Sequence, residues 1–354
     1  MDLLWLVGAL IVILVAAELF TNGIEWFGRR LNLAEGAVGS VLAAVGTALP
    51  ETMIPLVAII FAAGQHDGGG SAHEIGVGAI LGAPFMLATL AMFVTGLGVI
   101  AYRRRRHAGS RMPVDTTVLG MDIRYFFLAY TIAVAAALVP PELRVLRYAA
   151  VIAVLLIYAN YVRRHFEADP SVDVEDLSPL RFRRVDRRAF RLDPAVPRLR
   201  AINLQVLVAL AMIIGGAVVF VDAVQHISLG FGLDPALLAL VIAPVATELP
   251  EKFNSVIWVR QGKDTLAMGN ITGAMVFQSC IPTAIGIILA SDAWTLTADN
   301  AITFASAGIA FASTAAIFLP MMRRGSLAGR HLLVGGLFYA AYLGLVLSKL
   351  AGLW

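Results

Sequence analysis

Cysteine is almost absent from this chain, whose 354 residues include only Cys280. A single cysteine excludes any disulfide within the chain, so no covalent cross-link supports the fold. Charge is also scarce, because 14% of the residues are charged while 59% are hydrophobic. This composition, with many apolar runs of about 20 residues, is typical of a helical protein that crosses a membrane several times.

Recognisable catalytic groupings are missing as well. The chain has no His-Glu-x-x-His zinc motif, and no serine, cysteine or histidine grouping stands at catalytic spacing. We therefore do not expect an enzyme. The first five residues, Met1–Trp5, carry no basic cluster, and no small-residue cleavage site follows them cleanly. We predict that this segment is retained as the first membrane helix and is not a signal peptide.

The apolar runs predict an all-α membrane protein with ten transmembrane helices, five in each half. The first half covers residues 1–162, a polar linker covers 163–200, and the second half covers 201–354. The expected helices lie at about residues 3–27, 34–64, 75–101, 121–139, 143–162, 201–224, 235–260, 265–290, 301–321 and 331–350.

Lysine and arginine are absent from the expected loops after helices 2, 6 and 8 but present in every loop after helices 1, 3, 5, 7 and 9. The positive-inside rule then places both termini outside the inner (plasma) membrane and the linker in the cytoplasm. Arg144, Arg147 and Lys349 are exceptions near the outer ends. An odd number of helices per half gives the halves opposite orientations, as inverted repeats. Labels in the loop Gln65–Glu74 should therefore react from outside, and labels between Asp169 and Asp176 only from inside.

The linker is polar, of mixed charge and too short for a folded regulatory domain. We interpret it as a solvated connection between the halves. Its acidic residues leave a regulatory cation patch as the alternative: Asp169, Asp173, Glu175 and Asp176.

One short motif occurs twice, each time inside an apolar run: Gly46-Thr47-Ala48-Leu49-Pro50-Glu51 and Ala246-Thr247-Glu248-Leu249-Pro250-Glu251. A carboxylate is costly in hydrocarbon and therefore rare there without a function. Each proline lacks an N–H, so the carbonyl four residues earlier loses its helical partner. Each motif thus offers a carboxylate, a threonine hydroxyl and a free carbonyl within about one helical turn, about 5 Å. Such hard oxygen ligands suit small cations.

The two motifs align at a constant offset of 200 residues, and a second pair of blocks aligns at an offset of 191. The second pair is Gly78-Ala79-Ile80-Leu81-Gly82-Ala83 and Gly269-Asn270-Ile271-Thr272-Gly273-Ala274. Two ordered matches indicate an internal duplication. Inverted repeats with an interrupted helix at matching positions indicate a secondary transporter with a site near the membrane midplane.

These motifs resemble the repeat signature of the sodium/calcium exchanger family, within the calcium:cation antiporters. That signature is Gly-Thr-Ser-Leu-Pro-Glu, followed on the next helix by Gly-Asn-x-x-Gly-Ser. The resemblance spans all ten expected helices and implies a metal site made by Glu51, Glu251, Thr47, Thr247 and the carbonyls of Gly46 and Ala246. No permanently bound cofactor is implied. The partners it implies are transported inorganic cations and the lipid bilayer, without nucleic acid.

Several positions depart from the family pattern. The serine of the first motif is Ala48 in one half and Glu248 in the other, and the serine of the second motif is Ala83 and Ala274. The polar residue four places further on is Leu87 in the first half and Gln278 in the second. These changes remove sodium-type oxygen ligands, mostly from the first half.

Three polar residues of the second half are further candidate ligands. Glu248 lies three residues from Glu251, so both carboxylates can face one side of a helix, and Glu248 is either a third cation ligand, a proton carrier or an ion-pair partner. Asn270 and Gln278 lie on the next helix. Each is either part of the site or an interhelical hydrogen-bonding residue.

The predicted function is secondary active antiport of calcium or a similar divalent cation against sodium or protons. Alternating access would come from helices 1 and 6 sliding across a fixed core. The alternative is a non-transporting sensor or scaffold that kept the exchanger fold after losing ligands.

Overall fold

The computed structural model describes residues 2–30, 52–60, 69–168, 179–185, 197–232, 238–240 and 249–350. These parts of the chain are mainly helical. The main helices are α1 (Asp2–Arg30), α3 (Gly69–Met86), α4 (Met92–Tyr102), α5 (Thr116–Ala135), α6 (Arg144–Ala168), α7 (Leu199–Phe231), α9 (Leu249–Gln261), α10 (Asp264–Leu289), α11 (Ala301–Arg324), α12 (Gly329–Leu332) and α13 (Val334–Leu350).

Eight spans in the described residues are long and apolar enough to cross a membrane. They match eight of the ten helices expected from the sequence, with ends that differ by a few residues. The other two expected helices, 34–64 and 235–260, lie partly outside the described residues. Within them, residues 52–60 and α9 are helical.

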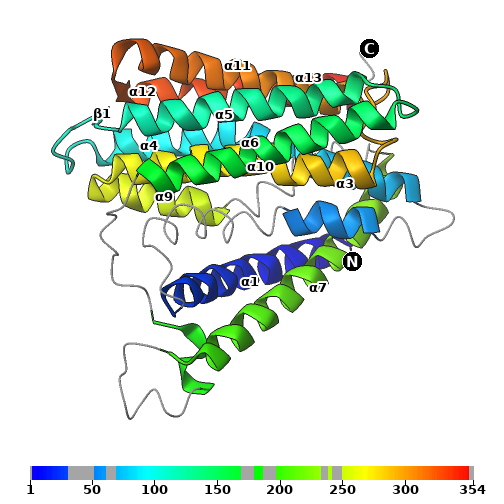
Figure 1. The fold of residues 1–354 in the computed structure, drawn as a ribbon, viewed down its shortest axis with the longest axis horizontal. Helices are drawn as coiled ribbons and strands as arrows, with labels where there is room; N and C mark the ends of the chain where they lie inside the picture. Colours follow the sequence, from blue (N-terminus) through cyan, green and yellow to red (C-terminus); the bar gives the residue numbers. More distant parts are fainter. Residues whose placement is uncertain are drawn as a thin grey trace.

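The long helices are arranged in two groups (Figure 1). Helices α1 and α7 lie side by side along most of their length and form the α1–α7 pair. The other long helices form a larger bundle, in which α10 contacts α3, α5, α6 and α9. Small residues bring the pair close together, because a Cβ on Gly23 would lie 2.8 Å from Val206 and one on Gly216 would lie 2.7 Å from Ile13.

The two ends of the bundle differ in their connections. Both chain termini lie toward one end, which we call the terminal end (Figure 1). At the other end, strand β1 (Arg111–Met112) pairs antiparallel with β2 (Leu327–Ala328), and the short 3-10 helix η4 (Arg181–Val185) belongs to the 163–200 linker. We call this the linker end.

The helices begin and end where their sequences provide caps. The Asp115 carboxylate accepts hydrogen bonds from the backbone N–H groups of Thr117 and Val118, which caps the start of α5. Gly232 and Gly325 adopt left-handed conformations at the ends of α7 and α11, where a side chain would be strained. The capping aspartate and the two glycines thus determine where these helices begin or end, which hydropathy alone does not predict.

The largest buried cluster joins α3, α5, α6, α10, α11 and α13. The two most buried membrane spans are α10 and the segment α3–η2–α4, in which η2 (Leu87–Ala91) is a π-helical turn. Pro84, which has no N–H, lies one turn before η2. Hydroxyl groups satisfy carbonyls there, since Thr89 donates to the Phe85 carbonyl and Ser313 of α11 donates to the Ala88 carbonyl.

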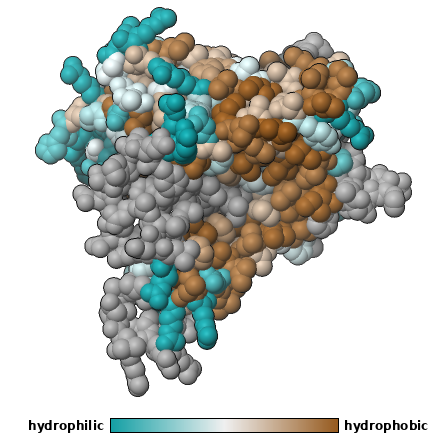
Figure 2. Space-filling model, viewed as in Figure 1, coloured by the Kyte–Doolittle hydropathy of each residue, from teal (hydrophilic) through white to brown (hydrophobic). Residues whose placement is uncertain are grey.

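The outer surface of the bundle is apolar, as expected for helices that face lipid. Hydrophobic side chains cover much of the middle of the described helices, and hydrophilic ones gather near the β1 end of the bundle (Figure 2). The exposed residues include Leu128, Ile152, Leu156 and Leu337, each more than half exposed. In a membrane protein such exposure needs no partner, because lipid tails cover it.

Candidate ion-binding site

The two Leu-Pro-Glu motifs stand next to described helices. Residues 52–60, directly after the first motif, are helical, and α9 begins at Leu249 within the second motif. Glu251 is therefore in the first turn of α9, although its side chain is outside the described part. The other predicted motif ligands lie outside the described residues: Gly46, Thr47, Glu51, Ala246, Thr247 and Glu248.

Helix α10 carries the two predicted ligands whose side chains are described, Asn270 and Gln278. Gln278 is only 2% exposed, and its Oε1 has no hydrogen-bond partner among the described residues. The buried Nδ2 of Asn270 is likewise unpartnered within that part of the chain. The two residues are eight positions apart, about 12 Å along the helix and about 80° around it. A buried amide with an unsatisfied group is costly unless another group or an ion satisfies it.

The first-half counterpart of Gln278 is Leu87, at the start of η2. Leu87 is fully buried in the largest apolar cluster and offers no oxygen. At this pair of matching positions, only the second half therefore provides a polar side chain. This asymmetry was visible in the sequence, and the structure adds that Leu87 lies in a π-helical turn while Gln278 lies in regular helix.

A buried ion pair fixes the start of α10. The guanidinium of Arg106 donates to both carboxylate oxygens of Asp264, at 2.7 and 2.6 Å, and both side chains are almost fully buried. Arg106 also donates to the carbonyls of Gly109, Arg111 and Val259. This bidentate geometry ties the loop after α4 to α9 and α10 at the linker end.

A second carboxylate holds the same helix further along. Asp122 of α5 is 1% exposed and accepts hydrogen bonds from Tyr161 at 3.0 Å and Thr272 at 2.5 Å, and the His165 Nε2 lies 3.0 Å away. It thus joins α5, α6 and α10. Sequence reasoning missed this residue, although a lone aspartate within the predicted 121–139 helix was the available signal.

Arg147 explains one exception to the charge pattern of the loops. Its side chain is 1% exposed and donates to the Val139 carbonyl, to the Ser291 carbonyl and hydroxyl, and to the Thr295 hydroxyl. It therefore binds two loops together at the terminal end. Lys349, another exception, donates to the Asp299 carbonyl at 3.0 Å.

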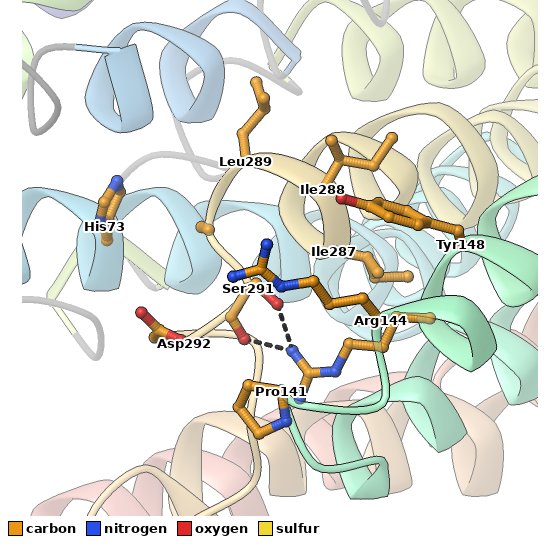
Figure 3. Close-up of a pocket in the computed structure, with 11 residues that line it drawn as sticks. His73, Pro141, Arg144, Tyr148, Ile287, Ile288, Leu289, Ser291 and Asp292 are labelled. Carbon is orange, nitrogen blue, oxygen red and sulfur yellow. Dashed lines mark hydrogen bonds between the residues drawn. The ribbon is translucent and has the colours of Figure 1, made fainter.

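A pocket of about 270 Å³ opens beside Arg147 at this end, between the starts of α3 and α6 and the end of α10 (Figure 3). His73, Arg144, Tyr148 and Asp292 line it together with apolar residues of α10. None of the lining residues is a predicted ion ligand. Asn270 and Gln278 are not among the residues that line it.

The geometry defines a class of protein before any relative is considered. A bundle of membrane helices, with an acidic motif in the sequence ahead of each of its two most buried spans, is typical of a secondary transporter. The chain belongs to the sodium/calcium exchanger protein family, whose model matches residues 1–165 and 203–350. It is accordingly a membrane transporter and not an enzyme.

Individual relatives cover nearly the whole chain. A protein described as a candidate antiporter, CaxA of Alkalimonas amylolytica, is 25% identical over 346 residues, which are 95% of this chain and 94% of the relative. The crystal structure of an H+/Ca2+ exchanger, CAX, has a TM-score of 0.70 at 16% identity, over 99% of this chain and 88% of the other. The sodium-calcium exchanger NCX_Mj, soaked with Na+ and Sr2+, has a TM-score of 0.57 at 17% identity, over 97% of each chain. At these identities the solved structures support the fold alone.

Proposed function

We propose that this protein is a secondary active antiporter that exchanges calcium or a similar divalent cation for sodium or protons. The observation that carries the proposal is the family match over both halves, joined to a Leu-Pro-Glu motif in each half. Two carboxylates contributed by inverted repeats form one shared midplane site in such an architecture.

The proposed site lies between Glu51 and Glu251. Thr47, Thr247 and the carbonyls of Gly46 and Ala246 complete it, with Glu248, Asn270 and Gln278 as further ligands from the second half. The unpartnered Gln278 Oε1 supports this assignment, because a cation would satisfy this oxygen. The unpartnered Asn270 Nδ2 is a donor, so a motif carboxylate or carbonyl would satisfy it.

Competition for one site makes the protein an exchanger in this proposal. An empty pair of carboxylates is too costly to carry across the bilayer, so the site changes sides only when a divalent cation or competing monovalent ions neutralise it. The α1–α7 pair, which packs against residues 52–60 and α3 in one buried cluster, is the proposed moving part. It would slide across the core formed by α3–η2–α4 and α10.

The proposed orientation puts the linker end in the cytoplasm and both termini outside. Its support is the distribution of basic residues, because Arg103, Arg104, Arg260, Lys263 and Arg323 all belong to linker-end connections. The basic exceptions Arg147 and Lys349 bind loop carbonyls, as shown above, so structural contacts account for their presence at the terminal end.

The test is ion flux in proteoliposomes that hold the purified protein. Glu51→Gln and Glu251→Gln should each abolish calcium uptake driven by a sodium or pH gradient, because each removes a charge that the divalent ion needs. Glu142→Gln, at an exposed carboxylate outside the proposed site, should leave uptake unchanged. If either motif variant transported calcium at the wild-type rate, the assignment of that glutamate as a ligand would be wrong.

Thermal unfolding of the same proteins separates a transporter from the scaffold alternative. A cation that binds only the folded state stabilises it increasingly as its concentration exceeds the Kd, so calcium should raise the Tm of the wild type and not of Glu251→Gln. A wild-type protein that is folded, inactive and insensitive to every tested cation would favour the scaffold.

A further inference from the structure

Two buried polar side chains of the α1–α7 pair have no part in the proposed ion site. Asn22 of α1 is 6% exposed, and Gln205 of α7 is fully buried. The Gln205 Nε2 donates to the Asn22 Oδ1 at 3.0 Å and to the Leu19 carbonyl at 2.8 Å. These bonds fix how α1 and α7 are aligned at the linker end of the pair.

The same two side chains bind the backbone of the linker. The N–H of Arg181 donates to the Asn22 Oδ1 at 3.2 Å, and the N–H of Phe182 donates to the Gln205 Oε1 at 2.9 Å. Two successive backbone groups of residues 179–185 are thus held by one residue of α1 and one of α7. This departs from the expectation of a linker that is solvated throughout.

An apolar contact and an ion pair complete the docked segment. Leu180 is 1% exposed and packs in one cluster with Trp26 of α1 and with Ala201 and Ile202 of α7. The Arg181 guanidinium lies 2.5 Å from the Glu18 carboxylate. That pair is more than half exposed, so the buried Leu180 and the backbone hydrogen bonds account for most of the binding.

We propose that residues 179–185 form a cytoplasmic latch that binds the α1–α7 pair and restrains its movement. The segment contacts both helices of the pair, while its chain continues to α6 of the larger bundle. A contact made in one position of the pair stabilises that position and slows departure from it. This inference rests on the proposed function, because it takes the α1–α7 pair as the moving part.

Docking is tested first, without any transport assay. Trypsin needs an accessible, extended backbone, so the docked segment should resist cleavage after Arg181 in the wild type. Leu180→Asp places a charge in the apolar contact and should make this bond cleavable, as read from fragment masses. Pro179→Asp adds the same charge at an exposed neighbour and should leave the protection intact. Equal cleavage of both variants and the wild type would overturn docking.

Transport then tests the restraint in the same preparations. Leu180→Asp should increase calcium exchange by at least about threefold relative to Pro179→Asp, since it removes a contact that favours one position. An unchanged or lower rate in a variant that trypsin shows to be undocked would overturn the latch. A wild type without any exchange would instead count against the proposed function, while the trypsin result would still report on docking.

A reversible lock gives the opposite perturbation. In a Cys280→Ser background, which removes the native thiol, Leu180→Cys and Ala201→Cys place two thiols in the cluster of the docked contact, and loss of free thiol on oxidation reports the disulfide. Oxidation should stop exchange, and reduction should restore it. Full exchange with the disulfide formed would show that the pair moves with the segment attached, which would overturn the restraint.

Discussion

Helix α10 and the segment α3–η2–α4 are the two most buried spans of the described chain and carry matching repeat blocks, yet they are held in different ways. Charged and polar side chains fix α10, with Asp264 bound to Arg106 and Thr272 bound to Asp122. The first-half segment is held by close packing, since a Cβ on Gly335 would lie 2.4 Å from the Thr89 carbonyl, and by the neutral hydroxyl of Ser313, which donates to the Ala88 carbonyl.

The two matching helices therefore differ in what they can offer an ion site: one presents an apolar surface and the other carries polar side chains. The π-helical turn at η2 offers an apolar surface around Leu87, whereas α10 runs as regular helix past Pro282 and carries Gln278. Side-chain ligands can therefore be concentrated on the helix whose position is set by ionic contacts. Specific hydrogen-bonded contacts hold a ligand-bearing helix in one register more strictly than apolar packing does.

The largest expected effect comes from breaking the ionic contact of α10. Asp264→Ala leaves the Arg106 guanidinium buried without its carboxylate and should lower the free energy of unfolding by about 3–5 kcal/mol. Denaturation in detergent measures this loss. Asp299→Ala, at an exposed aspartate in the loop after α10 of which only the backbone carbonyl accepts a hydrogen bond within the described residues, should change stability by less than about 0.5 kcal/mol. Equal effects of the two variants would show that the buried pair does not fix α10.

A smaller effect is expected when α10 is made to resemble the first half. Gln278→Leu should weaken divalent binding about tenfold, equivalent to about 1.4 kcal/mol, because one amide ligand is lost. Its stability should stay the same or rise, since the unpartnered Oε1 is removed. Calcium titration by calorimetry and thermal unfolding measure the two changes.

The control for that change is the neighbouring Ser279→Ala, because the Ser279 hydroxyl already donates to the Val276 carbonyl. Calcium affinity should not change in this variant. Lower stability of Gln278→Leu with unaltered affinity would identify Gln278 as an interhelical hydrogen-bonding residue, the other interpretation that its sequence position allowed.

Hydropathy predicted most of the fold because each membrane helix is specified by its own residues. The eight spans agree with the expected ranges, and the helix from about residue 75 to 101 required only the π-helical turn after Pro84 to be added. Asn270 and Gln278 were selected from the sequence because polar residues in an apolar run are conspicuous, and their role in an ion site stays a prediction. Their unpartnered atoms depend on neighbours from other helices, which no local pattern contains.

The contacts that sequence reasoning did not foresee join residues far apart in the chain. Asp122 and Thr272 are 150 positions apart, and Arg181 binds Asn22 across 159 positions. The polar sequence of the linker predicts a solvated connection, because the side chains that bind its backbone, Asn22 and Gln205, lie on other helices. Leu180 and Phe182, apolar residues in a largely charged linker, were the local sign that part of it docks.

The smallest expected effect concerns Glu248, where the two halves differ in charge. The matching residue of the first half is Ala48, so only the second half adds an acid to its motif. Two carboxylates three residues apart repel each other unless a cation or a proton lies between them, so cations and protons would compete for them. Fewer hydroxyl ligands make coordination of several sodium ions harder, and the extra acid makes proton competition easier.

Divalent binding should therefore weaken as the pH falls, because protons neutralise the carboxylates that the cation needs. Glu248→Ser removes one of these groups and should flatten the pH dependence of calcium affinity between about pH 6 and 8, the range that a carboxyl group in such a setting reaches. It should also increase the sensitivity of exchange to sodium. The measurement is calcium affinity in both proteins across this range, with and without sodium. Identical pH profiles would make Glu248 a structural residue, and the charge difference between the halves would then have no role in coupling.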